Sequence, residues 1–141
     1  MPAVTLQLTV PASLAAIRVA SEKMAASCAA LTHLEASLFE TAISEAMSNI
    51  IQHSLAGSGV TRFDIALLRT ARGIEVLFED RGRGMAIEDF ANRPASVDFD
   101  PGDLASVPES GMGIALIKSL MDDVEYSREQ GVNRLRLFKR C

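Results

Sequence analysis

The stretch "ISEAMSNIIQHS", residues 43–54, sets a row of polar side chains into an otherwise apolar helical pattern. Glu45, Asn49 and His53 follow one another at steps of four residues. A step of four turns an α-helix by only about 40°, so these side chains line one edge of the helix. Their mostly apolar neighbours are Phe39, Ile43, Ala46, Met47, Ile50 and Ile51. The stretch therefore predicts a helix that packs on the core and carries a polar ridge along one margin.

The residues alone leave two interpretations of this ridge open. A buried carboxylate is costly unless it is paired or metal-bound, and carboxylate and amide oxygens are ligands that suit Mg²⁺. Glu45 could also orient or deprotonate a hydroxyl group. The alternative is a solvated helix margin, because glutamate and asparagine are mostly exposed in proteins. In that case His53 is a structural histidine.

The rest of the chain mixes strand and helix signals. The expected elements are a strand at 4–10, helices at 12–31 and 34–55, strands at 61–70 and 73–80, a short helical piece near 86–91, a long loop over 92–110, a helix at 111–123, and strands at 124–129 and 133–140. This order predicts an α+β fold with helices layered on one mostly antiparallel sheet. The length of 141 residues predicts one domain over 1–141.

Composition argues against several classes of protein. The net charge of −4 is unlike that of a nucleic-acid binder, which usually carries a basic stripe. No stretch approaches the roughly 20 apolar residues that span a bilayer, and the N-terminus lacks the pattern of a signal peptide. The two cysteines make no disulfide framework. We therefore expect a soluble, cytoplasmic protein with no nucleic-acid or membrane partner.

A first glycine-rich stretch, "EDRGRGM" (79–85), follows a predicted strand. Asp80 lies at the strand end, where an ionised carboxylate could accept a hydrogen bond from an exocyclic amine such as that of adenine. Gly82 and Gly84 allow a sharp turn and the close approach of a ligand. The alternative is an ordinary turn, because aspartate and glycine are favoured turn residues.

A second glycine-rich stretch, "SGMGIALIKSL" (110–120), begins a predicted helix directly after the long loop. The free N–H groups of a helix start attract anions, and glycines let phosphates come close. The stretch lacks the P-loop and dinucleotide-fold patterns. A flexible glycine hinge is therefore an equal alternative for Gly111 and Gly113.

Three segments together resemble a known family: "SEAMSNIIQHS" (44–54), "EDRGRGM" (79–85) and "SGMGIALIKSLMDDVEYSR" (110–128). They resemble the histidine-kinase-like ATPases, and more closely the anti-sigma factor serine kinases of bacterial partner-switching systems. The similarity runs from about residue 5 to residue 140. It implies a histidine-kinase-like ATPase (Bergerat) fold, which is a two-layer α/β sandwich with a mixed, mostly antiparallel sheet.

The resemblance also implies a site for ATP and Mg²⁺. Glu45 is expected to act as the general base or to orient the attacking hydroxyl. Asn49 is expected to hold Mg²⁺, Asp80 to accept from the adenine amino group, and the loop over about 92–110 to be the lid. The glycine-rich positions implied at the nucleotide are Gly82 and Gly84 beneath the base, and Gly111, Met112 and Gly113 at the phosphates.

The implied function is ATP-dependent phosphorylation of a serine on a STAS-domain anti-sigma factor antagonist. The kinase of this family is a homodimer that also binds and inhibits a sigma factor. Some members place a threonine near the adenine, where this chain has Asn133 and Arg134, so that contact stays open. Two interpretations stay open for Arg83, which either contacts phosphate or contacts the partner protein. Two also stay open for Arg18, which either contacts the client protein or is a plain solvated arginine.

Two other functions remain as alternatives. The chain could be a regulatory module that binds nucleotide and partners without transferring phosphate, although a pure binder does not need the base Glu45. It could also be another ATPase of the same superfamily, such as a sensor histidine kinase domain or a gyrase-type module. The short chain disfavours that second alternative, because dimerisation and transducer segments are missing.

Overall fold

A computed structural model of the chain describes residues 3–28, 31–86 and 113–140. The elements in chain order are β1 (Ala3–Pro11), α1 (Leu14–Ala26), α2 (His33–Asn49), the π-helix η1 (Ile50–Leu55), β2 (Arg62–Arg69), β3 (Gly73–Asp80), α4 (Gly113–Leu120), β4 (Asp123–Glu129) and β5 (Val132–Arg140). The short helix expected near 86–91 and the loop at 92–110 lie almost wholly outside the described residues. Among those that are described, no helix is long and apolar enough to cross a membrane.

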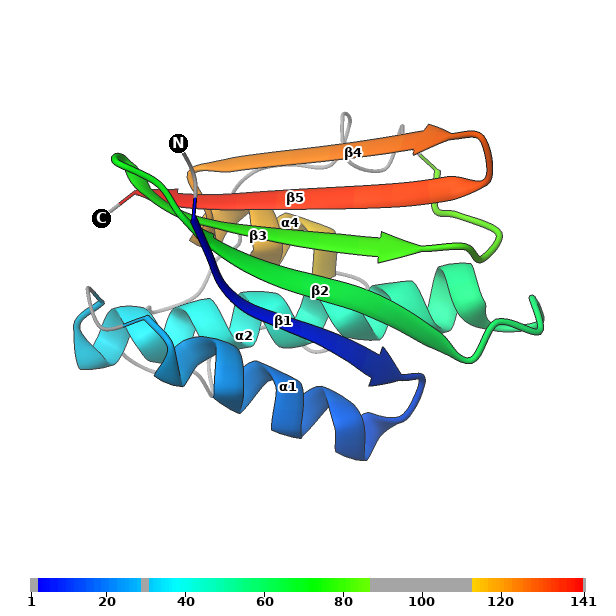
Figure 1. Cartoon of the computed structure of the whole chain (residues 1–141), viewed down its shortest axis with the longest axis horizontal. Coiled ribbons are helices and arrows are strands. Elements are labelled where there is room, and N and C mark those ends of the chain that lie inside the picture. Colours follow the sequence, from blue (N-terminus) through cyan, green and yellow to red (C-terminus); the bar gives the residue numbers. More distant parts are fainter. Residues whose placement is uncertain (1–2, 29–30, 87–112, 141) are drawn as a thin grey trace.

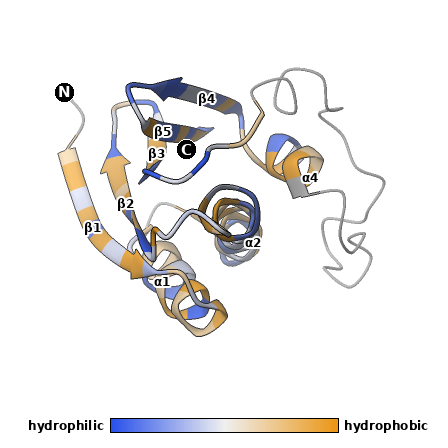
Figure 2. Ribbon diagram, turned by 90° about the vertical axis from the view of Figure 1, so that its right-hand side faces the viewer, coloured by the Kyte–Doolittle hydropathy of each residue, from blue (hydrophilic) through white to orange (hydrophobic). Residues whose placement is uncertain are grey.

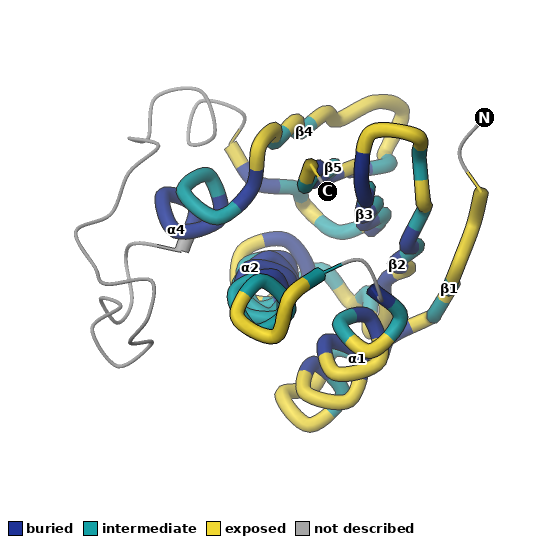
Figure 3. Tube along the Cα trace, turned by 90° about the vertical axis from the view of Figure 1, so that its left-hand side faces the viewer, coloured by how far each residue is buried: buried dark blue, intermediate teal, exposed yellow. Residues whose placement is uncertain are grey.

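The strands form one five-stranded sheet in the order β1-β2-β3-β5-β4 (Figure 1). Every neighbouring pair in this sheet is antiparallel. The helices α1, α2 and α4 cover the same face of the sheet, with α2 between the other two (Figures 2 and 3). The predicted two-layer α+β fold is confirmed.

Alternation along the central strands explains why only one face of the sheet is covered. In β2 the residues Phe63, Ile65 and Leu67 are buried, while their neighbours are exposed or half-buried. Side chains of a strand point to opposite faces in turn, so this pattern gives one apolar face and one polar face. The outer face carries ion pairs, among them Arg136 with Glu75 at 3.1 Å.

Side-chain caps set the starts of the first two helices. Ser13 accepts from the backbone N–H of Ala16, so α1 begins at Leu14 and is shorter at both ends than the predicted 12–31. Thr32 and Glu35 form a capping box at the start of α2, each accepting from the other's backbone N–H at 3.1 and 2.9 Å.

The helix predicted over 34–55 has about the predicted extent, but only its first part is an α-helix. It runs as an α-helix to Asn49 and continues as a π-helix over Ile50–Leu55. A π-helix bonds residue i to i+5 instead of i+4, so it takes up an extra residue in each turn. This change of register alters which side chains face the sheet.

The C-terminal hairpin agrees with the prediction. Gln130 and Gly131 both have positive φ angles, 52° and 77°, and form a tight turn between β4 and β5. The register then pairs Asn133 of β5 with Asp80 on one side and with Arg128 of β4 on the other. The preceding helix ends at Leu120 instead of the predicted residue 123.

Candidate functional site

The polar edge of α2 keeps Glu45 and Asn49 at the margin of the core, where both are half-buried. Asn49 Nδ2 donates to the backbone oxygen of Glu45 at 2.9 Å. This bond fixes the amide, and no hydrogen bond between described residues uses its Oδ1 atom. Asn49 therefore presents an oxygen that can accept from a ligand or bind a cation.

The Glu45 carboxylate makes no hydrogen bond or ion pair with another described residue. Burial raises the pKa of this carboxyl above the ordinary value of a glutamate. A carboxylate that is partly desolvated and has no partner costs stability, because nothing offsets the lost hydration. Such a group is a candidate for a chemical role.

Replacing Glu45 with glutamine is expected to stabilise the fold at neutral pH. The folded pKa is raised, so above it the wild-type carboxylate is ionised in both states and the folded state bears the desolvation cost. Glu45→Gln removes this cost and raises the melting temperature by a few degrees at pH 7. The gain shrinks as the pH falls through the raised pKa, and vanishes below the ordinary glutamate pKa. Thermal unfolding across this pH range measures it, and a melting temperature that falls at pH 7 would contradict it.

His53 does not join this edge, contrary to the prediction. A straight α-helix would align His53 with Asn49, but the π-helix shifts the register and His53 is exposed. Ser54, five residues after Asn49, is fully buried and turns toward the sheet instead. Ser54 is not among the predicted site residues, although its spacing of seven and four residues from the buried Met47 and Ile50 is a signal that could have found it.

Asp80 is the buried carboxylate at the end of β3, with only 4% of its surface exposed. Three donors converge on its Oδ1 atom: Ser54 Oγ at 2.5 Å, Asn133 Nδ2 at 2.8 Å and the backbone N–H of Gly82 at 2.9 Å. No hydrogen bond within the described part of the chain uses Oδ2. The protein thus fixes one oxygen and leaves the other available to a donor from outside.

Hydrogen bonds from two elements, η1 and β4, hold the backbone after Asp80. Ser54 accepts twice, its carbonyl from the N–H of Arg83 at 2.8 Å and its Oγ from the N–H of Gly84 at 2.9 Å. The hydroxyl of Tyr126 in β4 accepts from the N–H of Met85 at 2.7 Å. Arg128, also in β4, donates to the carbonyl of Arg83 at 2.6 Å. These contacts make residues 82–85 a fixed wall beside the Asp80 carboxylate.

Close packing against backbone requires a glycine at 82, and the left-handed backbone favours one at 84. A Cβ at Gly82 would lie 2.4 Å from the carbonyl oxygen of Ser54, which is a backbone atom. A Cβ at Gly84 would lie 2.3 Å from Arg128 Nε, and Gly84 also has a φ of 82°. At these glycines η1 and β4 approach the segment closely, while the predicted approach of a ligand stays a prediction.

Gly84→Ala is expected to lower the free energy of unfolding by about 2–3 kcal/mol. A left-handed backbone costs an alanine about 1–2 kcal/mol, and displacing Arg128 from the Arg83 carbonyl adds about 1 kcal/mol. Gly59 is a matched control, because it also has a φ of 82° but no atom within 4 Å of a Cβ there. Urea unfolding of both variants measures the difference. Equal losses at the two positions would show that Arg128 contributes nothing.

Asn133 and Arg134 lie on opposite faces of β5 and have different partners, while a contact of either with adenine stays a prediction. Asn133 is 3% exposed and donates to Asp80 Oδ1 and, at 3.1 Å, to the carbonyl of Gly82. Arg134 lies on the opposite face of β5, where it pairs with Glu79 at 2.7 Å. Arg134 therefore takes no part in the Asp80 network.

A comparison of the sequence with models of protein families shows the family, and the match covers almost the whole chain. A sequence model described as the histidine kinase-like ATPase domain matches residues 9–139. The chain belongs to this family. The family resemblance predicted from the three segments is therefore confirmed.

Relatives of this ATPase domain include proteins named serine-protein kinase RsbW, from Bacillus cereus, Bacillus anthracis and Bacillus thuringiensis. Each is 29% identical over 94 residues, which cover 67% of this chain and 58% of the relative. The alignment thus spans little more than half the length of these relatives. A crystal structure of the RsbU and RsbW domains of a Mycobacterium tuberculosis protein has a similar fold, with a TM-score of 0.62 at 17% identity. That likeness covers 99% of this chain and 32% of the other chain.

The donors of this ATPase domain fit a Mg²⁺ that is held mainly by substrate phosphates and waters. No cluster of three or more His, Cys, Asp or Glu side chains that could hold a metal occurs within residues 3–28, 31–86 and 113–140. Mg²⁺ commonly keeps several waters and binds one or two protein oxygens together with substrate phosphates. The free Oδ1 of Asn49 suits this arrangement and leaves the remaining positions to phosphate and water.

The second glycine-rich segment is described only from Gly113, the first residue of α4. Gly111, Met112 and the predicted lid over 92–110 lie outside the described residues. The helix α4 packs against α2, and its buried residues Ile114 and Ile117 join the core. The start of α4 therefore belongs to the same helical layer as the polar edge of α2.

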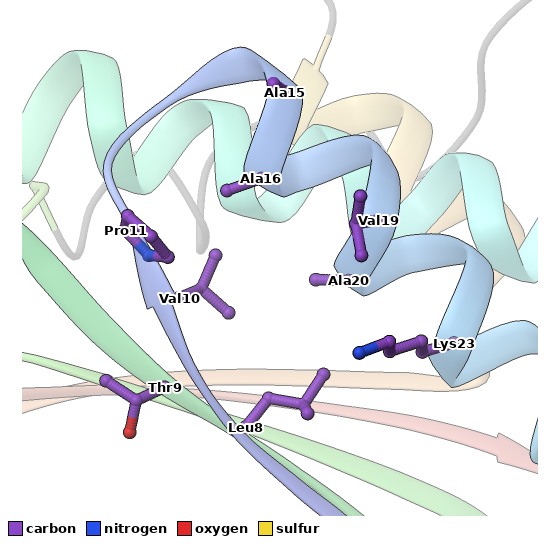
Figure 4. A pocket seen from close by; sticks show the side chains of 9 residues that line it. All are labelled: Leu8, Thr9, Val10, Pro11, Ala15, Ala16, Val19, Ala20 and Lys23. Atoms are coloured by element: carbon purple, nitrogen blue, oxygen red, sulfur yellow. The ribbon is translucent and has the colours of Figure 1, made fainter.

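Two further features lie apart from this site. An apolar groove of about 340 Å³ runs between β1 and α1, lined by residues such as Leu8, Val10 and Val19 (Figure 4). Arg18 is exposed on α1 and pairs with Glu22 at 3.3 Å. A contact of Arg18 with a client protein stays a prediction.

Proposed function

We propose that this chain is an ATP-dependent serine protein kinase of a bacterial partner-switching system, with residues 1–141 forming one ATPase domain. Membership of the histidine-kinase-like ATPase family supports the use of ATP. Relatives named serine-protein kinase support serine as the acceptor. The expected substrate is a STAS-domain antagonist, and a sigma factor is the second partner of a cytoplasmic homodimer.

In the proposed complex, Asp80 Oδ2 accepts a hydrogen bond from the adenine amino group. Gly82 and Gly84 form the wall beneath the base, and the backbone N–H groups of Gly111, Met112 and Gly113 bind the phosphates. Asn49 Oδ1 is the protein ligand of Mg²⁺. The metal, when bound, supplies charge neutralisation at the phosphates, which is the main requirement of phosphoryl transfer.

Glu45 is the proposed base. The serine hydroxyl of the antagonist attacks the γ-phosphorus, the bond from that phosphorus to the ADP oxygen breaks, and the Glu45 carboxylate takes the hydroxyl proton. The observation that supports transfer over binding alone is this half-buried carboxylate, which has no partner among the described residues and a raised pKa. Burial without a partner disfavours the ionised form of this carboxyl, which makes it a candidate for a chemical role.

One assay separates the kinase from a binding module that does not transfer phosphate. The protein is mixed with Mg-ATP labelled on the γ-phosphate and with a STAS-domain antagonist protein from the same host. Label on a serine of that protein is the result expected of a kinase. ATP binding with no label on any protein is the result expected of the binding module, and would overturn the proposed transfer.

A further inference from the structure

Ser54 connects the end of the long helix to the Asp80 carboxylate. Its Oγ donates to Asp80 Oδ1 at 2.5 Å and accepts from the N–H of Gly84 at 2.9 Å. Its carbonyl accepts from the N–H of Arg83 at 2.8 Å. One fully buried residue thus fixes both the carboxylate and the wall beside it.

The direction of the Ser54 hydroxyl proton follows from these partners. Gly84 N–H can only donate, so it occupies a lone pair of Oγ, and the hydroxyl proton is free to point at Asp80. Asp80 Oδ1 then faces donors alone, namely the Ser54 hydroxyl, the Gly82 N–H and the Asn133 amide. Three donors on one oxygen fix the plane of the carboxylate, and with it the position of Oδ2.

The other two donors cannot fix this plane by themselves. Asn133 Nδ2 is divided among acceptors, since it also lies 3.1 Å from the carbonyl of Gly82 and 3.4 Å from Ser54 Oγ. The Gly82 N–H comes from the residue two positions along the same chain and moves with it. Without Ser54 Oγ, the carboxylate loses its shortest bond, and Gly84 loses the acceptor that holds its N–H.

We propose that Ser54 is a positioning residue for base selectivity: by fixing Asp80, it makes the site favour a purine with an exocyclic amine over one with an oxygen at the same place. Ser54, and not its neighbour His53, reaches the carboxylate from the π-helix η1. This inference rests on the proposed ATP site. It extends that proposal by naming the residue on which the discrimination between bases depends.

The test compares the affinities of the full chain for ATP and for inosine triphosphate, which has an oxygen in place of the adenine amino group. Ser54→Ala is expected to lower the preference for ATP over inosine triphosphate by about tenfold, because a fixed acceptor becomes a movable one. The loss falls on ATP, while the affinity for inosine triphosphate stays within about twofold. Ser54→Cys, with its weaker donor, is expected to give an intermediate preference.

Ser21→Ala is the matched control. Ser21 is also a buried serine, with 2% exposed, but its Oγ donates to the carbonyl of Arg18 within α1. This variant loses a comparable buried hydrogen bond and should leave the ratio of the two affinities unchanged. A general weakening of the fold would lower both affinities together and so would not mimic the expected result.

The outcomes separate this inference from the proposed function. A wild-type chain without preference for ATP would overturn the proposed adenine contact itself. A wild-type preference that stays the same in Ser54→Ala and Ser54→Cys would overturn the positioning role alone. Equal losses of both nucleotides in Ser54→Ala would reduce Ser54 to a structural residue and overturn that role as well.

Discussion

Glu45→Gln is expected to lower the rate of phosphoryl transfer to the serine substrate by about a thousandfold, which is within the usual range for loss of a general base. The amide cannot take the hydroxyl proton, but it has nearly the same size and keeps the helix edge intact. The Kd for Mg-ATP should stay within about twofold, since no proposed contact to the nucleotide involves Glu45. Single-turnover transfer of labelled phosphate and equilibrium binding measure the two effects separately.

Glu40→Gln is the control for this substitution. Glu40 is a half-buried glutamate on the same helix, five residues earlier and off the polar edge. Its variant should transfer phosphate at the wild-type rate. Full transfer activity in Glu45→Gln would remove Glu45 from the role of base, whereas a loss of ATP binding would mean that its role is in holding the nucleotide.

Asp80→Asn is expected to raise the Kd for ATP by about a hundredfold. The three donors that converge on Asp80 Oδ1 require an oxygen there, so the asparagine amide must place its NH₂ group where Oδ2 was. A donor then faces the adenine amino group, which is itself a donor. Inosine triphosphate, with an acceptor at that place, should lose little affinity or gain some, so the preference between the two nucleotides is reversed.

Glu79→Gln provides the neighbouring control. Glu79 lies on the outer face of the sheet, where it pairs with Arg134 at 2.7 Å, and its loss should leave both affinities unchanged. An Asp80→Asn variant that folds and binds ATP as tightly as the wild type would contradict the assigned contact. Circular dichroism and urea unfolding establish that each variant is folded before its binding is measured.

Local signals were enough to predict most of the fold. The helix that carries Glu45 and Asn49 has an apolar repeat, and its start is set by Thr32 and Glu35, three residues apart. Gly82 and Gly84, shortly after Asp80, predict a strand end at this aspartate, and β3 indeed ends there. Such features depend on residues that are neighbours in the chain, which is why the sequence was sufficient.

The parts that the sequence did not predict depend on long-range pairing. Whether Asn133 or Arg134 meets Asp80 is decided by the register of β5 against β3, since a shift of one residue exchanges the two faces of a strand. Helical spacing from Met47 and Ile50 places Ser54 on the apolar face, but it does not specify that Asp80 is its partner. These contacts join residues 26 to 79 positions apart in the chain, and no local pattern specifies them.

The roles assigned to Glu45, Asn49 and the glycine-rich segments remain predictions about chemistry. The geometry agrees with them at Asp80, where a fixed carboxylate keeps one oxygen available, and at Asn49, whose amide oxygen is likewise available. Glu45 adds a carboxylate whose pKa is raised by burial. All of these roles require that the groups act on one nucleotide.

Equilibrium dialysis of the full chain against labelled ATP, with and without Mg²⁺, tests this requirement most directly. We predict saturable binding of one ATP per chain, strengthened by Mg²⁺ and weakened by Asp80→Asn. A properly folded wild-type chain that retains no ATP at millimolar concentration, with Mg²⁺ present, would contradict the account at its centre.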